Sequence, residues 1–178
     1  MPRYVAFLRA INLGATRKFS KDDVRAATEA AGGTEVETYL NTGNVVLTSP
    51  KRSTAAVARI LEQAYADDRG FDVPTLVFTP DELREIVRTA DELVAEHGEP
   101  EQLNVTLFAE PPSAAASAAV QALELRDRVV VRGRAAHVLL AGSFHDAKVW
   151  GRSEFKALGV GTARNVTVLR EVARRWCT

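Results

Sequence analysis

Several features that would place a protein in a familiar functional class are missing from this sequence. Its 178 residues include a single cysteine, Cys177, so the chain forms no internal disulfide and no cysteine-rich zinc site. Neither sign of charge is in excess, because 23 basic residues balance 23 acidic ones. Proteins that bind duplex nucleic acid gain much of their affinity by neutralising phosphates, so we expect no duplex nucleic acid partner.

The sequence also has no apolar run long enough to cross a bilayer, and we expect no membrane partner. Residues 4–8 begin a strand pattern at once, without the layout of a signal peptide, so we expect a cytoplasmic protein. Hydrophobic residues make up 46% and charged residues 26% of the chain, a balance that supports a buried core. The sequence does not indicate an oligomeric state.

Strand and helix patterns alternate in the first half of the chain. The apolar run at residues 3–9 predicts a central strand, and Ser20 is placed to cap a first helix that ends at the glycine pair 32–33. Strands around a polar hairpin turn, a second helix and a further strand follow, at residues 35–40, 44–48, 53–68 and 73–79. The resulting order, β-α-β-β-α-β, is the ferredoxin-like pattern.

The second half of the chain repeats most of this order. A helix capped by Thr79 begins at Pro80, and we interpret residues 80–100 as a connecting helix. A strand at residues 103–109 leads into an alanine-rich helix that ends at about residue 124. Two strands follow at 128–132 and 136–140, then a loop-rich insert at 141–164 and a final helix at about 165–176. We therefore predict an α+β fold for a single domain, 1–178, in which two ferredoxin-like lobes with antiparallel sheets, 1–79 and 101–178, pack as one unit.

Three segments resemble the domain-of-unknown-function family 1697. Residues 8–14, Leu-Arg-Ala-Ile-Asn-Leu-Gly, are similar to the family's opening Leu-Arg-Gly-Ile-Asn-Val-Gly segment, with Ala10 in place of the usual glycine. Residues 38–46 are similar to its Thr-Tyr-Ile-(Asn or Gln)-Ser-Gly-Asn-Val-Val segment, and residues 162–165 to its Thr-x-Arg-Asn segment. Val166 stands where the family typically has tryptophan. The resemblance implies an α+β structure of two related lobes and names no activity.

The ferredoxin-like order brings two polar segments to one edge of the first sheet. The ends of the first two strands and the start of the third meet there, which places together Arg9, Asn12, Asn41, Thr42 and Asn44. A guanidinium, several amides and backbone N–H groups suit a carboxylate, a phosphate or a nucleobase edge. We predict that residues 9–14 and 41–44 bind a small anionic or nucleotide-like ligand. The alternative is that the asparagines stabilise their own turn and that Arg9 pairs with a nearby carboxylate.

The segment Thr162-Ala163-Arg164-Asn165 suggests a second contribution to the same ligand. Either Thr162 or Asn165 is able to cap the final helix, and Arg164 would then lie at a helix N-terminus, where anions are favoured. If the second lobe folds over the first, Arg164 and Asn165 join Arg9 around one anion. The alternative is an ordinary cap beside an exposed arginine.

Other chemistry has little support in the sequence. His97, His137 and His145 are far apart and form no metal-ligand pair, so we expect no metal site, and no motif implies a cofactor. An enzyme that uses the same edge, with Arg9 stabilising negative charge, is the second hypothesis, although no proton-transfer group is evident there and catalytic residues stay unassigned. A protein-interaction or single-strand nucleic-acid-binding module is the third. A deep polar pocket at the edge favours the first two hypotheses, and a flat surface favours the third.

Overall fold

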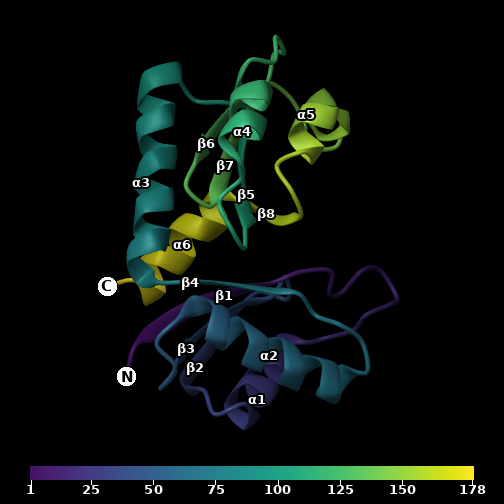
Figure 1. Cartoon of the computed structure of the whole chain (residues 1–178), viewed down its shortest axis with the longest axis vertical. Coiled ribbons are helices and arrows are strands. Elements are labelled where there is room, and N and C mark those ends of the chain that lie inside the picture. The colour runs from purple at the N-terminus through teal and green to yellow at the C-terminus, as the bar shows by residue number, and fades with distance from the viewer. The chain divides into compact units, whose positions relative to one another are not determined.

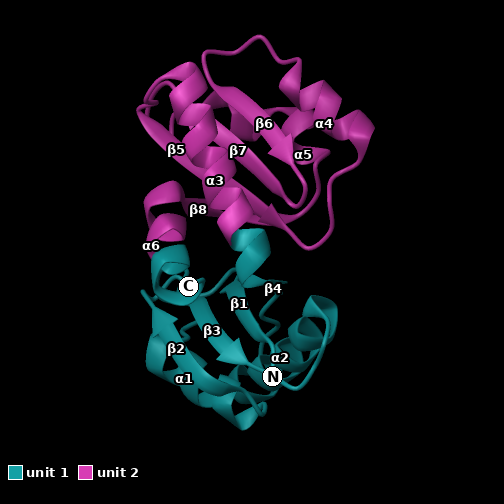
Figure 2. Ribbon diagram, turned by 90° about the vertical axis from the view of Figure 1, so that its left-hand side faces the viewer, with its two compact units in different colours: residues 1–83, 172–178 teal, residues 84–171 magenta.

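The structure of the protein is a computed structural model that describes residues 1–178. The chain divides into two compact units, one made of residues 1–83 and 172–178 and the other of residues 84–171 (Figure 2). Each unit contains one four-stranded antiparallel sheet, so the predicted α+β class with two antiparallel sheets is confirmed. None of the helices combines the length and the apolar character that crossing a membrane requires.

The first unit is built around its first strand. In the sheet order β2-β3-β1-β4, β1 pairs antiparallel with both β3 and β4, and the helices α1 and α2 lie on one side of the sheet (Figure 1). The elements of this unit are β1 (Arg3–Leu8), α1 (Lys21–Ala30), β2 (Thr34–Tyr39), β3 (Asn44–Thr48), α2 (Thr54–Arg69) and β4 (Thr75–Phe78).

Strand β1 is buried on both faces, as its continuous apolar run predicts. Tyr4 and Leu8 on one face belong to the core cluster that includes side chains of α1 and α2. Phe7 on the other face is also fully buried, and its ring contacts that of Phe78 edge to face, with centroids 5.9 Å apart. The hydrophobic effect at both faces therefore holds β1 at the centre of the sheet.

The C-terminal residues complete this unit. Trp176 is buried, and its indole Nε1 donates a hydrogen bond to Glu37 Oε2 over 3.1 Å. The guanidinium of Arg175 lies 4.7 Å from the ring centroid of Tyr39. Residues at the end of the chain thus pack against strand β2, far from them in sequence.

The helix starts follow the signals in the sequence. Ser20 Oγ accepts a hydrogen bond from Asp23 N at the start of α1, as predicted. At the start of α3 (Pro80–His97), Thr79 Oγ1 accepts from Glu82 N over 3.2 Å, and Glu82 Oε2 accepts from Thr79 N over 2.7 Å. This reciprocal pair is a capping box, which satisfies two N–H groups that the helix itself leaves unpaired.

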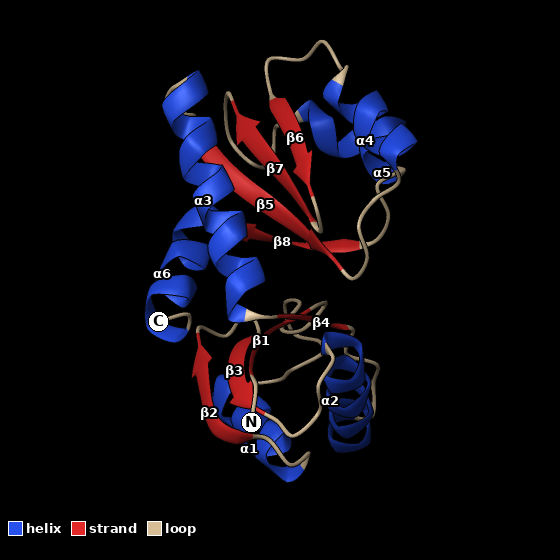
Figure 3. Cartoon of the chain, turned by 60° about the vertical axis from the view of Figure 1, so that its left-hand side comes forward, coloured by secondary structure: helices blue, strands red, loops and turns tan.

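The second unit has a sheet of the same order, β6-β7-β5-β8, and Figure 3 shows α3 and α4 on opposite sides of it. Val120 of α4 belongs to the core cluster on one face, together with Val138 of β7. The helix α6 (Val166–Trp176) begins here and ends in the first unit. The remaining elements are β5 (Gln102–Phe108), α4 (Ala114–Gln121), β6 (Arg128–Arg132), β7 (Ala135–Leu140), the 3-10 helix η1 (Lys148–Gly151), α5 (Ser153–Lys156) and β8 (Gly161–Asn165).

The prediction of a loop-rich insert at residues 141–164 is wrong at its C-terminal end. Residues 161–165 form β8, which pairs antiparallel with β5 so that Arg164 lies opposite Val105. Thr162 and Arg164 alternate with the exposed Ala163 and Asn165 and are themselves buried. Because polar side chains occupy the buried positions, the alternation of apolar residues that normally reveals a strand is absent.

His137 is a buried histidine in the middle of β7. Its side chain is 0% exposed, its Nε2 lies 3.0 Å from the carbonyl oxygen of Ile86 in α3, and its Nδ1 has no hydrogen-bond partner. Burial lowers the pKa of His137 below its ordinary value of 6.5, although the hydrogen bond to Ile86 opposes this shift.

We expect the free energy of unfolding to depend on the protonation of His137. Below pH 6.5 the unfolded chain binds a proton that the folded chain does not, so the contribution of neutral His137 is fully present above pH 6.5 and is lost as the pH falls towards the folded pKa. The slope is at most about 1.4 kcal/mol per pH unit. Urea unfolding of the protein and of His137→Gln across this range measures it, and equal slopes for both would contradict the expectation.

Replacement of Ala10 by glycine is expected to stabilise the fold. Ala10 has φ +57°, a left-handed conformation that glycine adopts without steric cost. We expect Ala10→Gly to raise the free energy of unfolding by about 0.5–1 kcal/mol, measured by urea unfolding. Ala15→Gly is the control in the same loop, since Ala15 has no positive φ. A loss of stability in both variants would show that strain at Ala10 is unimportant.

Candidate functional site

The connection between β1 and α1 has an unusual backbone. Ala10, Asn12, Gly14 and Arg17 have φ values of +57°, +52°, +57° and +53°, all in the left-handed region. Only glycine and, less readily, asparagine adopt this conformation at low cost. Three of these four residues carry side chains, so contacts from the rest of the unit must hold the loop in place.

The side chain of Asn12 supplies several of these contacts. Its Oδ1 accepts a hydrogen bond from Phe19 N over 2.9 Å. Its Nδ2 donates to Phe19 O over 2.8 Å and to Asn41 O over 2.6 Å. The carboxamide of Asn12 therefore closes its own loop and fastens that loop to the β2–β3 hairpin.

The hairpin residues are committed in a similar way. Asn41 Oδ1 accepts a hydrogen bond from Lys21 N, the first residue of α1, over 3.1 Å. Asn44 is buried, and its Nδ2 donates to Tyr39 O over 2.8 Å and to Thr42 Oγ1 over 3.0 Å. The structure thus brings the predicted asparagines to one edge of the sheet, where they bind the backbone of their own unit.

Gly43 brings the hairpin close to the end of β1. A Cβ atom at Gly43 would lie 2.6 Å from Leu8 Cβ, and the residue has φ +81°. Gly43 O accepts a hydrogen bond from Leu8 N over 2.8 Å. Both the approach and the conformation therefore require glycine at this position. Arg9, which follows Leu8, is half-buried, and its backbone N–H donates to Pro74 O over 2.8 Å.

This edge of the sheet is not hollowed enough to enclose a ligand. The depression beside it is lined by residues of the hairpin and of α1, leaves about 150 Å³ of empty space and has no room for a water molecule. The edge is therefore a flat surface rather than a deep pocket. Ligand binding by Arg9 and its neighbours stays a prediction.

Arg164 directly precedes the cap of α6, but its side chain is buried. It is part of β8, is 8% exposed, and its Nη1 donates to Thr162 Oγ1 over 2.8 Å and to Ala163 O over 3.0 Å. Burial lowers the pKa of Arg164 to about 10. The alternative of an exposed arginine is therefore wrong. Asn165 Oδ1 accepts from Thr167 N over 2.8 Å, so Asn165, rather than Thr162, caps α6. An anion shared with Arg9 stays a prediction.

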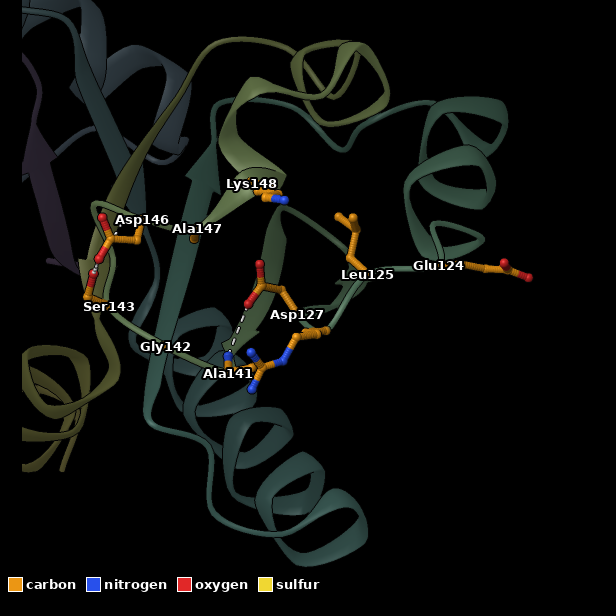
Figure 4. A pocket seen from close by; sticks show the side chains of 10 residues that line it. Glu124, Leu125, Asp127, Ala141, Gly142, Ser143, Asp146, Ala147 and Lys148 are labelled. Carbon is orange, nitrogen blue, oxygen red and sulfur yellow. Dashed lines mark hydrogen bonds between the residues drawn. The ribbon is translucent and has the colours of Figure 1, made fainter.

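A cavity in the second unit lies at residues that the sequence did not suggest. It has a volume of about 440 Å³ and lies between the α4–β6 connection and the segment that follows β7 (Figure 4). The residues that line it are Glu124, Leu125, Arg126, Asp127, Ala141, Gly142, Ser143, Asp146, Ala147 and Lys148. The only signal in the sequence was the run of arginines that begins at Arg126, which is also typical of a solvated strand and turn.

Two acidic side chains help to form the wall of this cavity. Asp127 Oδ1 accepts a hydrogen bond from Ala141 N over 3.0 Å, which joins the two segments (Figure 4). Ser143 Oγ donates to Asp146 Oδ2 over 2.6 Å and accepts from Asp146 N over 3.3 Å. Both carboxylates are therefore engaged in holding the connections.

The basic side chains of the cavity are uncommitted. Arg126 and Lys148 are exposed and form no hydrogen bond or ion pair with another residue. In Figure 4 the side chain of Lys148 extends towards the α4–β6 connection, whereas Glu124 points away from the other lining residues. The two cations at the cavity thus have no ion-pair partner, and the Asp127 and Asp146 carboxylates, which bond only to neutral groups, keep their negative charge. No group of histidine, cysteine, aspartate or glutamate side chains in the structure is arranged to hold a metal ion.

Comparisons with other proteins give the fold and the family. The chain matches the structure of a conserved bacterial protein of Streptococcus pneumoniae with a TM-score of 0.75 and 18% identity, over 97% of each chain. This similarity shows a shared fold. No curated protein matches the chain. Residues 1–137 match the family model described as a protein of unknown function, DUF1697. Because this match covers most of the chain, the chain belongs to the DUF1697 family.

Proposed function

We propose that the protein binds a small anionic ligand in the cavity of its second unit. The observation that carries this proposal is a cavity of about 440 Å³ in which two cations, Arg126 and Lys148, have no partner of their own. Sites for small molecules usually measure about 300–1,000 Å³ and contain a few convergent polar groups. A carboxylate or a phosphate would pair with these two cations.

The lining residues also limit the form of the ligand. The planar guanidinium of Arg126 suits a bidentate contact with two oxygens, and the ammonium of Lys148 acts as a point charge. Leu125, Ala141 and Ala147 provide apolar surface on the same cavity. The volume is larger than one anionic group needs. An organic body with one acidic group, such as a sugar phosphate or a nucleotide, therefore fits better than an inorganic ion.

The ligand class is the one that the sequence predicts, but the place is different. At residues 9–14 and 41–44, the amides of Asn12, Asn41 and Asn44 are used by the backbone of their own unit. An incoming ligand would have to displace these hydrogen bonds, each of which contributes about 0.5–1.5 kcal/mol to the stability of the fold. At the cavity of the second unit, Arg126 and Lys148 require no such displacement.

Binding is better supported than catalysis. Of the acidic residues at the cavity, Asp127 and Asp146 accept hydrogen bonds that hold the surrounding connections, and Glu124 points away. A general acid or base must reach the proton that it transfers. The hydrogen bonds of Asp127 and Asp146 give these residues a structural role, and we therefore propose a binding protein rather than an enzyme.

We also propose that each unit is a ferredoxin-like lobe. The sheet orders β2-β3-β1-β4 and β6-β7-β5-β8 correspond position by position, and in the first unit the element order is β-α-β-β-α-β. In the second unit, η1 and α5 occupy the position of the second helix. These features support a repeated lobe.

Ligand-induced stabilisation tests the proposed function. We would screen phosphate, sugar phosphates, nucleotides and carboxylates by thermal shift. A ligand at about 100 times its dissociation constant should stabilise the fold by about 2.7 kcal/mol. Arg126→Gln and Lys148→Gln should each weaken binding at least about tenfold, a loss of about 1.4 kcal/mol.

The matched control is Arg128→Gln, because Arg128 is also exposed and unpaired but lies outside the cavity. Equal weakening by all three substitutions would show a diffuse charge effect and contradict the site. Loss of the shift in Arg9→Gln alone would move the site to the edge of the first sheet.

A further inference from the structure

Leu40 is found where neither backbone conformation nor burial favours leucine. It lies in the β2–β3 hairpin with φ +59°, a left-handed conformation that costs a leucine free energy and that glycine or asparagine adopt more readily. Its side chain is 44% exposed and belongs to no core cluster. A strained residue that folding does not explain is a reason to look for a function.

A second exposed leucine lies close by. Leu13 is 53% exposed in the β1–α1 connection. It directly follows Asn12, and Leu40 directly precedes Asn41, and these two neighbours are joined by the hydrogen bond from Asn12 Nδ2 to Asn41 O over 2.6 Å. The two leucines are thus carried by segments that are fastened to each other.

The segments that carry the leucines are held in one conformation. In addition to the bonds of Asn12, the Arg17 guanidinium donates to Ala10 O and Asp72 O, and it lies 4.5 Å from the ring centroid of Phe71. A surface that is already ordered loses little conformational entropy when it binds a partner. The two leucines are therefore exposed on segments whose conformation is already fixed before a partner binds.

Basic residues predominate in the segments that carry the leucines, although Asp22 and Asp23 follow Lys21 in the first turn of α1. The first 21 residues contain no aspartate or glutamate, and residues 38–44 of the hairpin contain no charge. Lys18 and Lys21, which follow Leu13 in the same connection, are exposed. Lys18 Nζ donates only to a backbone carbonyl, that of Gly14, over 2.6 Å. The chemistry that complements this surface is apolar and negatively charged.

We propose that Leu13, Lys18, Lys21 and Leu40 form a docking surface for an acidic segment of another protein that also carries apolar side chains. Positive charge around a small apolar centre favours such a segment by charge complementarity. A lipid surface fits less well, because membrane binding grows with the apolar area that is buried and two leucines supply little of it. The surface lies in the first unit and does not depend on the cavity of the second.

Binding of defined peptides tests the proposal. A soluble peptide that alternates glutamate and leucine would be titrated into the labelled protein, and backbone amide chemical shifts would be followed. A peptide that alternates lysine and leucine is the control for charge. We expect the acidic peptide to shift the amides of residues 12–21 and 38–44, and the basic peptide to shift none of them.

Substitution by asparagine separates docking from folding. Because asparagine tolerates a left-handed backbone, Leu40→Asn should leave the melting temperature unchanged or raise it. The same substitution should weaken binding of the acidic peptide at least tenfold. Leu13→Asn should weaken the peptide as well. Val160→Asn, at a 72% exposed apolar residue in the second unit, should have no effect.

Three results would overturn the docking surface. A lower melting temperature of Leu40→Asn would make Leu40 a structural residue. If the acidic peptide caused no chemical-shift change at its solubility limit, or if both peptides caused equal changes, the surface would not select for an acidic partner. Binding to phosphatidylserine vesicles without binding to the acidic peptide would assign the surface to a membrane. None of these results bears on Arg126 and Lys148, so the two proposals fail independently.

Discussion

Burial of a central strand on both faces is the constraint that organises each unit. β1 and β5 lie between two other strands of their sheets, and their side chains are buried on both sides. A strand in this position has little room for unpaired polar groups, because each one costs free energy when it leaves water. Arg3 Nε in β1 and Asn104 Nδ2 in β5 are nevertheless buried without a hydrogen-bond partner. The asparagine-rich edge and the cavity both lie in connections at the strand ends.

The asparagines of the first unit show how the same residues serve folding before function. Asn12 is itself in the left-handed region and Asn41 follows the left-handed Leu40, and the hydrogen bonds of both side chains help to hold these conformations. Once these hydrogen bonds are formed, few donors remain for a ligand. What the edge offers instead is a rigid surface with two exposed leucines and several cations, which suits a macromolecular partner better than a small molecule.

The cavity of the second unit arises from a different arrangement. Asp127 joins the α4–β6 connection to the segment after β7 through one hydrogen bond to Ala141 N, and Ser143 and Asp146 stabilise the turn that follows. These contacts order the two connections, and Arg126 and Lys148 line the cavity beside them without partners. In this cavity the carboxylates of Asp127 and Asp146 hold the connections, and the proposed ligand would bind to the cations Arg126 and Lys148.

The sequence by itself determined the α+β class, the central position of β1, the caps at Ser20 and Thr79 and the family, because these depend on local patterns of apolar and capping residues. It also placed Asn12, Asn41 and Asn44 at one edge. Only the tertiary structure decided that their amides are occupied, that residues 161–165 form a strand with a buried Arg164, and that Arg126 and Lys148 share a cavity. Hydrogen-bond partners and unpaired charges depend on segments distant in sequence, which no local pattern records.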